Sequence, residues 1–305
     1  MSETHYQYVP PEVAQDRSLI GRIRLFLKMI DFHESVFSLP FALSAAILAA
    51  AWRGRGVTLR ELFWVVVAMV AARSIALATN RVVDVEYDRR NPRTARAIFP
   101  RGLLAAGEVW AFVAFFGAVF LFAAWQFNPL CFWLSPLALA WITVYSYAKR
   151  FTWLVHLWLG LSLGLAPVAA WLALAGRLTW PPVFLGLAVT FWVTGFDIIF
   201  ALQDRDADAQ EGLYSIPVRF GIGGALRLSA ASHLLAVAFF VASGLAAGLS
   251  WPYWVGVAAI GVLLLVEHAM VSEDDLSRLH SAYFRVNGLV STVFFLVTWA
   301  ALRLR

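Results

Sequence analysis

Two acidic clusters carry residue types that could do chemistry in an otherwise apolar chain. The segment NRVVDVEYD places Asn80, Asp84 and Asp88 at four-residue spacing, and Arg73 lies seven residues before Asn80. A helix turns 100° per residue, so these side chains form one stripe, and Glu86 points away from it. A charge inside an apolar segment is costly and usually faces the protein interior. The stripe is therefore expected to point into a helical bundle.

The second acidic cluster, in DIIFALQDRDAD, repeats this pattern later in the chain. Asp197, Asp204 and Asp208 lie at offsets of 0, 7 and 11, all within about 20° of one line on a helix, whereas Asp206 points elsewhere. Two inward stripes of carboxylates on one side of a membrane repel each other unless cations intervene. Mg²⁺ suits such a place, because it takes hard oxygen ligands and typically binds one or two carboxylates plus substrate phosphates.

Basic and phenolic side chains complete the set. Tyr145 and Lys149 end an apolar segment as YSYAK, four residues apart on one face. The loop NPRTARAIFPRG, which contains Arg93, follows the first cluster. These groups could bind phosphate oxygens. One acidic pair alone is equally well explained by a solvated loop, but two clusters together with Arg73 and the Tyr-Lys pair favour a functional site.

Other polar residues of the apolar segments are interpreted as structural. His33 is expected at an interface or in packing rather than as a base, and the adjacent Glu267 and His268 are assigned no catalytic role. Cys131 is the only cysteine, which excludes an internal disulfide. The 14 Trp and 24 Phe are expected mostly to face lipid or the membrane interface.

The elements that must position these residues are transmembrane helices. The chain has 305 residues, 61% hydrophobic and 14% charged, whereas soluble domains are about 45–50% apolar and about 25% charged. A bilayer is crossed by about 20 apolar residues, and only helices satisfy their own backbone there. The sixth segment could be two pieces, which gives a range of eight to ten. The sequence predicts an all-α polytopic membrane protein with nine transmembrane helices, near 31–52, 61–83, 107–125, 130–148, 153–174, 182–202, 226–248, 252–270 and 283–302.

The ends of these segments predict the domain organisation and topology. Residues 1–27 are mostly polar and are expected to form a cytoplasmic N-terminal segment, and 28–305 a single transmembrane domain. The N-terminal side and every second loop after it hold 17 of the 24 Lys and Arg, against six on the opposite side. Lys and Arg concentrate in cytoplasmic loops. A multi-pass protein of the cytoplasmic (inner) membrane is expected, with both acidic clusters opening on the cytoplasmic side. This topology accounts for the net charge of +5, so no nucleic-acid partner is expected.

The sequence resembles the UbiA superfamily of intramembrane aromatic prenyltransferases. The resemblance is carried by NRVVDVEYD, DRDAD and YSYAK, which match the family patterns NxxxDxxxD, DxxxD and YxxxK in order. A finer resemblance, in FSLPFAL, NPRTAR, FDIIFALQD and GLYSIPVRFG, is to bacterial 4-hydroxybenzoate polyprenyltransferases of quinone synthesis. Within that group the chain looks more like the branch proposed to prenylate 1,4-dihydroxy-6-naphthoate in the futalosine route to menaquinone.

The resemblance implies Mg²⁺-dependent transfer of a polyprenyl group from polyprenyl diphosphate to a small aromatic acceptor. The acceptor is of the 4-hydroxybenzoate or 1,4-dihydroxy-6-naphthoate type, in ubiquinone or menaquinone biosynthesis. No required protein partner is evident from the sequence. The four metal-holding and catalytic carboxylates would work in two pairs, each with one Mg²⁺: Asp84 with Asp88, and Asp204 with Asp208.

The same resemblance implies a set of groups around the diphosphate. Asn80 would add a direct or water-mediated ligand, and Asp197 would support the site from deeper in the bundle. Arg73 is expected to orient the carboxylates. The residues that would hold the diphosphate itself are Tyr145, Lys149 and Arg93.

Three alternatives remain beside this interpretation. A sister activity of the same superfamily, such as haem farnesylation or chlorophyll-type esterification, shares its motifs. A cation-coupled transporter would use buried carboxylates as an ion path, but it predicts polar residues near the midplane of several helices, whereas here they crowd one membrane face. A structural role would leave the alignment of acidic residues unexplained.

Overall fold

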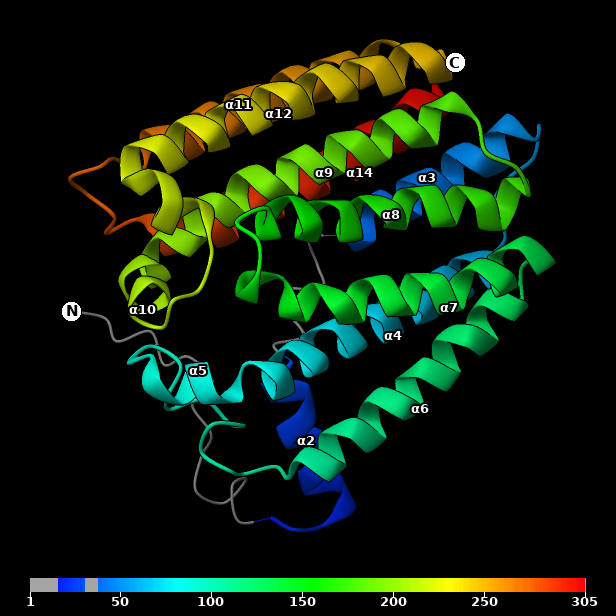
Figure 1. Ribbon diagram of the computed structural model, residues 1–305. Coiled ribbons are helices and arrows are strands. Elements are labelled where there is room, and N and C mark those ends of the chain that lie inside the picture. The colour runs from blue at the N-terminus through cyan, green and yellow to red at the C-terminus, as the bar shows by residue number, and fades with distance from the viewer. Residues whose placement is uncertain (1–15, 31–37, 305) are drawn as a thin grey trace.

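The chain folds into one bundle of helices that lie side by side (Figure 1). The computed structural model describes residues 16–30 and 38–304, and within these ranges it has no strand. The expected all-α membrane fold is confirmed. Its apolar helices are α3 (Leu39–Trp52), α4 (Leu59–Val83), α6 (Ala106–Trp125), α7 (Pro129–Val144), α8 (Val155–Ala175), α9 (Trp180–Ala201), α11 (Ile216–Ala247), α12 (Trp251–Ala269) and α14 (Asn287–Arg303).

The helices match the predicted segments closely, with one shorter than expected. Among the described residues, eight helical stretches are long and apolar enough to cross a membrane. The remaining apolar helix, α3, has 14 described residues. At 1.5 Å per residue it is about 21 Å long, which is less than the roughly 30 Å of a hydrocarbon core. The first part of its predicted segment, with His33, lies outside the described residues. The predicted sixth segment is the single helix α9 rather than two pieces.

Two helices begin differently from the prediction. The seventh segment was expected from residue 226, but α11 begins at Ile216 and breaks its helical geometry at Gly221, whose φ of 69° suits glycine. The ninth predicted segment was expected from residue 283. In the structure it is preceded by the short turn α13 (Leu279–Ser281) and begins within the π-helical turn η4 (Ala282–Val286). Such π turns occur often at functional sites. Hydrophobicity alone does not signal either irregularity, because both lie in partly polar sequence.

The described part of the N-terminal segment packs onto the bundle. Residues Leu19–Met29 form α2, and the Phe26 ring stacks on Phe112 of α6 at 4.0 Å between centroids. The guanidinium of Arg22 donates to both carboxylate oxygens of Glu108, at 2.7 and 2.8 Å. One face of this helix, with Leu25, Phe26 and Met29, is buried, whereas other apolar side chains such as Leu19 remain exposed. Residues Leu19–Met29 therefore form a helix that packs on the bundle.

An aromatic cluster joins four helices at the centre of the bundle. The Phe41 ring on α3 lies 5.0 Å from Trp192 on α9 and 4.8 Å from Phe294 on α14, measured between centroids. Phe294 lies 5.0 Å from Phe240 on α11. All four side chains are essentially inaccessible. Aromatic pairs contribute about 0.5–1.5 kcal/mol each beyond area burial, so this cluster fixes how α3, α9, α11 and α14 meet.

Small residues bring α8 and α9 into close contact. A Cβ atom added at Gly164 would collide with the carbonyl oxygen of Gly186, and one at Gly160 would collide with that of Thr190. Helices in lipid associate mainly through such close packing, for which small residues are required. The contact holds the start of α8 against the second half of α9, where Asp197 lies.

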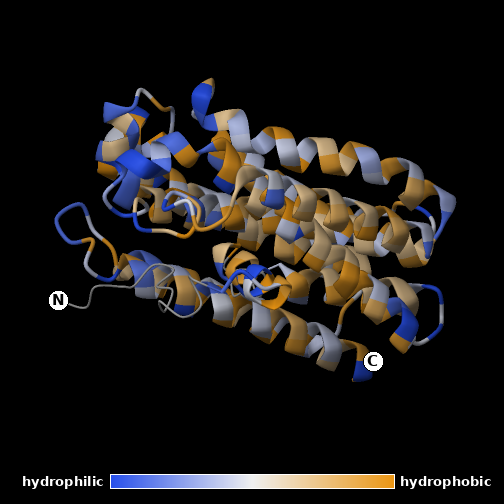
Figure 2. Cartoon of the chain, turned by 90° about the horizontal axis from the view of Figure 1, so that it is seen from below, coloured by the Kyte–Doolittle hydropathy of each residue, from blue (hydrophilic) through white to orange (hydrophobic). Residues whose placement is uncertain are grey.

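Polar residues gather at one end of the bundle (Figure 2). Four short elements lie there, at or next to the ends of α4, α7 and α9: α5 (Val85–Arg90), η2 (Tyr145–Arg150), η3 (Leu202–Asp204) and α10 (Arg205–Gln210). Figure 1 shows α5 and α10 at the end opposite the C-terminus. The apolar helices thus carry every predicted motif to the same end of the molecule.

Candidate active site

A cavity of about 310 Å³, here called the polar cavity, lies at this end of the bundle between α4, α5, η2, α8, α9 and α10. The structure brings all ten predicted site residues to its lining: Arg73, Asn80, Asp84, Asp88, Arg93, Tyr145, Lys149, Asp197, Asp204 and Asp208. The residues expected to point away do so, since the side chains of Glu86 and Asp206 are 62% and 86% exposed.

The first acidic cluster spans a break between two helices. Helix α4 ends at Val83, and Asp84 links it to α5. The amide of Asp84 donates to the carbonyl of Asn80 at 2.9 Å, and that of Asp88 to the carbonyl of Asp84 at 2.8 Å. The four-residue spacing therefore survives the break. The Asn80 side-chain amide donates to Asp84 Oδ2 at 2.7 Å, which orients that carboxylate toward the cavity.

Burial alters the acidity of Asp84 in the first cluster. It raises the pKa of Asp84 to about 6, and the neighbouring charge of Asp88 adds to the rise, while Lys149, Arg150 and Arg81 oppose it. A buried carboxylate resists ionisation unless a cation is close. The cluster is thus a place where an added cation would be stabilised.

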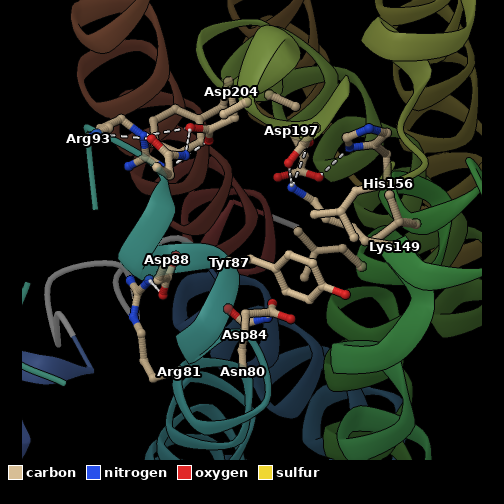
Figure 3. Close-up of a pocket in the computed structure, with 18 of the residues that line it drawn as sticks. Asn80, Arg81, Asp84, Tyr87, Asp88, Arg93, Lys149, His156, Asp197 and Asp204 are labelled. Atoms are coloured by element: carbon tan, nitrogen blue, oxygen red, sulfur yellow. Dashed lines mark hydrogen bonds and ion pairs between the residues drawn. The ribbon is translucent and has the colours of Figure 1, made fainter. Parts of the chain in front are cut away.

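The second acidic cluster lies on two short helices after α9. Asp204 ends η3 and Asp208 belongs to α10, so the expected continuous helix is interrupted here too. Both side chains are buried. Figure 3 shows Asp204 and Asp197 on the opposite side of the cavity from Asn80 and Asp84.

Basic side chains from other elements counter these carboxylates. Arg93 donates through Nε and Nη2 to both oxygens of Asp204, at 2.9 and 2.7 Å. Lys149 Nζ lies 3.0 Å from Asp208 Oδ2. Longer ion pairs join Arg150 to Asp84, at 3.6 Å, and Arg81 to Asp88, at 3.9 Å. Each predicted metal-holding carboxylate therefore lies beside one guanidinium or ammonium group.

Among the described residues, the oxygen donors of the cavity occur in pairs and not in larger clusters. Within residues 16–30 and 38–304, no three His, Cys, Asp or Glu side chains converge closely enough to hold a metal ion by themselves. Carboxylate pairs remain, and Mg²⁺ commonly binds one or two carboxylates together with waters and substrate phosphates. One oxygen, Asp88 Oδ2, is buried without a hydrogen-bond partner. Hard oxygens of this kind suit Mg²⁺ when a substrate supplies further ligands.

The polar cavity adjoins a second, apolar cavity of about 200 Å³. The apolar cavity is lined by residues of α3, α4, α6, α7 and α8, most of them Ala, Leu, Val, Ile and Phe. Five residues line both cavities: Arg73, Ala76, Tyr145, Leu159 and Leu163. A ligand with a charged head and a hydrocarbon chain would find matching surroundings in the two spaces.

Several cavity residues were not predicted from the sequence. His156 hydrogen-bonds Asp197, Asn91 donates to Asp204 Oδ1 at 2.9 Å, and the Arg150 guanidinium lies 5.4 Å from the Tyr87 ring centroid. The available signal for His156 was a polar residue in the apolar stretch FTWLVHLW, whereas Asn91 lies in the charged stretch YDRRNPR, where nothing local distinguishes it. Their partners could not be read from the sequence, because each pair joins different elements.

A separate buried polar network lies outside this cavity. Asn287 of α14 donates to Glu267 Oε1 at 2.7 Å and accepts from the Trp192 indole at 2.8 Å. Beside it, His233 Nδ1 lies 3.0 Å from His268 Nε2. The network ties α9, α11, α12 and α14 together, and none of its side chains lines the polar cavity. Its position accords with the structural role assigned to Glu267 and His268.

A bundle of membrane-length helices with a charged cavity among the helix ends defines a polytopic integral membrane protein with an intramembrane site. The model of the UbiA prenyltransferase family matches residues 38–299. The chain therefore belongs to the UbiA prenyltransferase family. The family and the enzyme class expected from the sequence are confirmed.

Relatives and solved structures cover nearly the whole chain. A 4-hydroxybenzoate octaprenyltransferase of Cupriavidus necator is 29% identical over 284 residues, covering 90% of this chain and 96% of the relative. The apo structure of a UbiA homolog from Aeropyrum pernix K1 is 33% identical, with a TM-score of 0.79 over 88% of this chain and 97% of that chain. A UbiA homolog from Archaeoglobus fulgidus bound to DMAPP and Mg²⁺ is 20% identical, with a TM-score of 0.72, covering 92% and 99%. The last of these shows the shared fold.

Proposed function

We propose that this prenyltransferase moves a polyprenyl group from polyprenyl diphosphate to a hydroxylated aromatic acceptor, with Mg²⁺ as its cofactor. One observation carries the proposal: two acidic clusters and their basic partners line a polar cavity that adjoins an apolar one. The polar cavity suits a diphosphate with its cations, and the apolar cavity suits a hydrocarbon chain. The Archaeoglobus structure with DMAPP and Mg²⁺ supports the same pairing of ligands.

Two carboxylate pairs would hold the cations. Asp84 and Asp88 form one pair, Asp204 and Asp208 the other, and Asn80 orients Asp84. Bound Mg²⁺ neutralises the negative charge that develops on the departing diphosphate. The buried oxygen of Asp88, which lacks a hydrogen-bond partner, is a suitable ligand atom.

Basic side chains would bind the diphosphate oxygens. Lys149 and Arg93 already lie in the cavity and contact carboxylates. An ammonium has three donors and a guanidinium five, so each keeps donors for an anion. Tyr145 and Arg73 line both cavities and would lie where the diphosphate head meets the prenyl chain.

Aromatic faces would stabilise the reacting carbon. When the C1–O bond of the donor breaks, its electron pair leaves with the diphosphate and C1 becomes an allylic cation. Phe196, Phe200 and Tyr283 line the polar cavity beside the acidic groups. Aromatic rings attract cations through their electron-rich faces, so these rings would stabilise the allylic cation.

The acceptor and the membrane side belong to the same proposal. The Cupriavidus relative is named for 4-hydroxybenzoate, whereas finer motifs of this sequence resemble the branch proposed to use 1,4-dihydroxy-6-naphthoate. The arginine distribution supports an active site open to the cytoplasm, in the cytoplasmic membrane. Either ring carries the hydroxyl group that makes it electron-rich.

A direct assay tests this proposal. Purified protein receives Mg²⁺, a labelled polyprenyl diphosphate and one of the two acceptors, with heat-treated protein as the blank. The expected result is a prenylated product from one acceptor and none without Mg²⁺. Absence of product from both acceptors, in protein that binds a non-hydrolysable prenyl thiodiphosphate, would rule out these two rings. Absence of binding as well would rule out the prenyl diphosphate donor.

A further inference from the structure

The Asp197 carboxylate is held by a buried histidine with a defined tautomer. His156 Nδ1 lies 2.7 Å from Asp197 Oδ2, and Nε2 of the same ring accepts a hydrogen bond from the Ile216 amide at 3.3 Å. A ring nitrogen that accepts carries no proton, so the single proton of neutral imidazole lies on Nδ1 and is donated to Asp197. The chain of contacts from Ile216 to Asp197 therefore sets both the tautomer and the direction of the carboxylate.

The surrounding fold makes this arrangement rigid. Ile216 is the first residue of α11, where backbone N–H groups have no partner within the helix. His156 lies at the start of α8 with its side chain 1% exposed. The close glycine contact between α8 and α9 holds it against Asp197. Three helices thus cooperate to orient one carboxylate.

Asp197 differs from the other carboxylates of the cavity in its partners. Asp84, Asp88, Asp204 and Asp208 each lie within 4 Å of an Arg or Lys side chain. Asp197 has no Arg or Lys at ion-pair distance in the described part of the chain, where His156 is its one hydrogen-bond partner. Its side chain remains 18% exposed to the cavity. The second oxygen, Oδ1, is therefore available to a neutral donor such as a hydroxyl group.

Flat aromatic side chains line the same cavity as Asp197. Phe200 follows Asp197 by three residues on α9, and its ring centroid lies 4.1 Å from that of Tyr283. Phe196 lies 5.3 Å from the same tyrosine, which the π-helical turn η4 carries. All three rings line the polar cavity. A cavity that offers both a carboxylate acceptor and aromatic faces can accommodate a phenolic ring. Figure 3 shows Asp197 and His156 across the cavity from Asn80 and Asp84.

We propose that Asp197 binds the hydroxyl of the aromatic acceptor and serves as the base of the reaction, with His156 as its positioning residue. This inference rests on the proposed function. It replaces the expectation that Asp197 supports the diphosphate. The acceptor ring lies against Phe200 and Tyr283, and its hydroxyl donates to Asp197 Oδ1.

The proposed step conserves protons and electrons. Asp197 takes the hydroxyl proton as the ring carbon beside that hydroxyl forms a bond to C1 of the donor. The C1–O bond breaks, and its electron pair leaves with the diphosphate. The alkylated ring then loses its C–H proton to the diphosphate, and Asp197 returns its proton to the ring oxygen. Asp197 ends the cycle ionised, as it began.

The test uses full-length protein with Asp197→Asn, and Asp206→Asn as the matched control in the same segment. Asparagine keeps the shape but removes the basicity. General-base catalysis contributes roughly 10²–10⁴-fold, so we expect kcat to fall at least about 100-fold. Binding of the thiodiphosphate analogue with Mg²⁺ should change by less than about threefold. Asp206→Asn should match the parent in both assays, because its side chain is exposed.

A second readout separates a base from a structural carboxylate. A ring-fluorinated acceptor has a more acidic hydroxyl and needs less help to ionise, so the deficit of Asp197→Asn should shrink at least about tenfold with it. His156→Gln should lower kcat less than Asp197→Asn and show the same partial rescue. If Asp197→Asn does not fold, His156→Gln carries the test alone.

Each other outcome overturns the inference. Equal loss of analogue binding and turnover would place Asp197 at the diphosphate. An unchanged kcat in Asp197→Asn would show that Asp197 takes no part in the reaction. A loss of kcat that is equally large with the fluorinated acceptor would show that Asp197 does not take the hydroxyl proton. A parent protein that fails to bind the analogue would instead refute the proposed function, so the two failures are distinguishable.

Discussion

The guanidinium of Arg93 joins two acidic clusters that are far apart in sequence. It donates to both carboxylate oxygens of Asp204, at 2.9 and 2.7 Å, across 111 positions of the chain. Asn91 donates to the same carboxylate at 2.9 Å. The loop that follows the first acidic cluster is thereby attached to the second. The geometry of the cavity depends on this tertiary contact as well as on the helices.

Arg93→Ala should lower both stability and donor binding. The variant leaves the buried Asp204 with Asn91 as its remaining hydrogen-bond donor, and charged hydrogen bonds contribute about 1.5–3 kcal/mol each. Partial exposure of Arg93 places the expected coupling in a double-mutant cycle with Asp204→Ala near 1–2 kcal/mol, measured by unfolding in SDS. Arg93→Lys should recover only part of the lost stability, because an ammonium group lacks the planar pair of donors with which a guanidinium binds both carboxylate oxygens. A coupling indistinguishable from zero would contradict this account.

Asp84→Ala and Asp204→Ala should each abolish detectable prenyl transfer while the protein still inserts and purifies. Each change removes an oxygen ligand from a different carboxylate pair, and the opposite pair cannot replace it. The measurement is product formation at saturating donor, with melting in detergent as a check on folding. Asp206→Ala is the control, since that side chain points away from the cavity. Activity within tenfold of the parent in either variant would remove that carboxylate from the metal assignment.

Removal of divalent metal should stop the reaction reversibly. EDTA-treated protein is expected to bind the thiodiphosphate analogue at least about tenfold more weakly, because carboxylates and phosphates then repel each other without a bridging cation. Mg²⁺ should restore binding and turnover. Ca²⁺, which prefers longer bonds and more ligands, should restore turnover less. Equal analogue binding with and without metal would show that the basic side chains suffice.

Ala166→Phe should shorten the prenyl chain that the enzyme accepts. Ala166 lines the apolar cavity on α8, and added volume in a packed space typically costs about 1–3 kcal/mol. Turnover of a long donor such as octaprenyl diphosphate should fall about tenfold relative to geranyl diphosphate. Ala114→Phe on the exposed face of α6 is the matched control. An equal effect on both donors would place the chain elsewhere.

The fold and the positions of the acidic residues were predictable because they follow local rules. Apolar runs of membrane length specify helices in lipid, and four-residue spacing puts Asn80, Asp84 and Asp88 on one side even across the break at Asp84. Gly221 and the turn at Ala282–Val286 were not predicted, since neither leaves a mark in hydrophobicity.

The partners of each site residue were not predictable, because they depend on how helices meet. Lys149 was expected at the diphosphate, and the structure shows its contact with Asp208. His156 is one polar residue in an apolar helix, and nothing local indicates that the Ile216 amide 60 residues later fixes its tautomer. Such contacts arise from the packing of α8, α9 and α11, which a single sequence does not specify.

The residues shared by the two cavities bear on how the two products leave the enzyme. Arg73 and Tyr145 line both spaces, so the boundary between charge and hydrocarbon lies at those two side chains. Under the proposed reaction the bond that breaks lies at this boundary. The diphosphate then leaves the polar cavity toward water, whereas the alkylated ring follows its prenyl tail past this boundary toward lipid. The enzyme would discharge two products of opposite solubility without either crossing the path of the other.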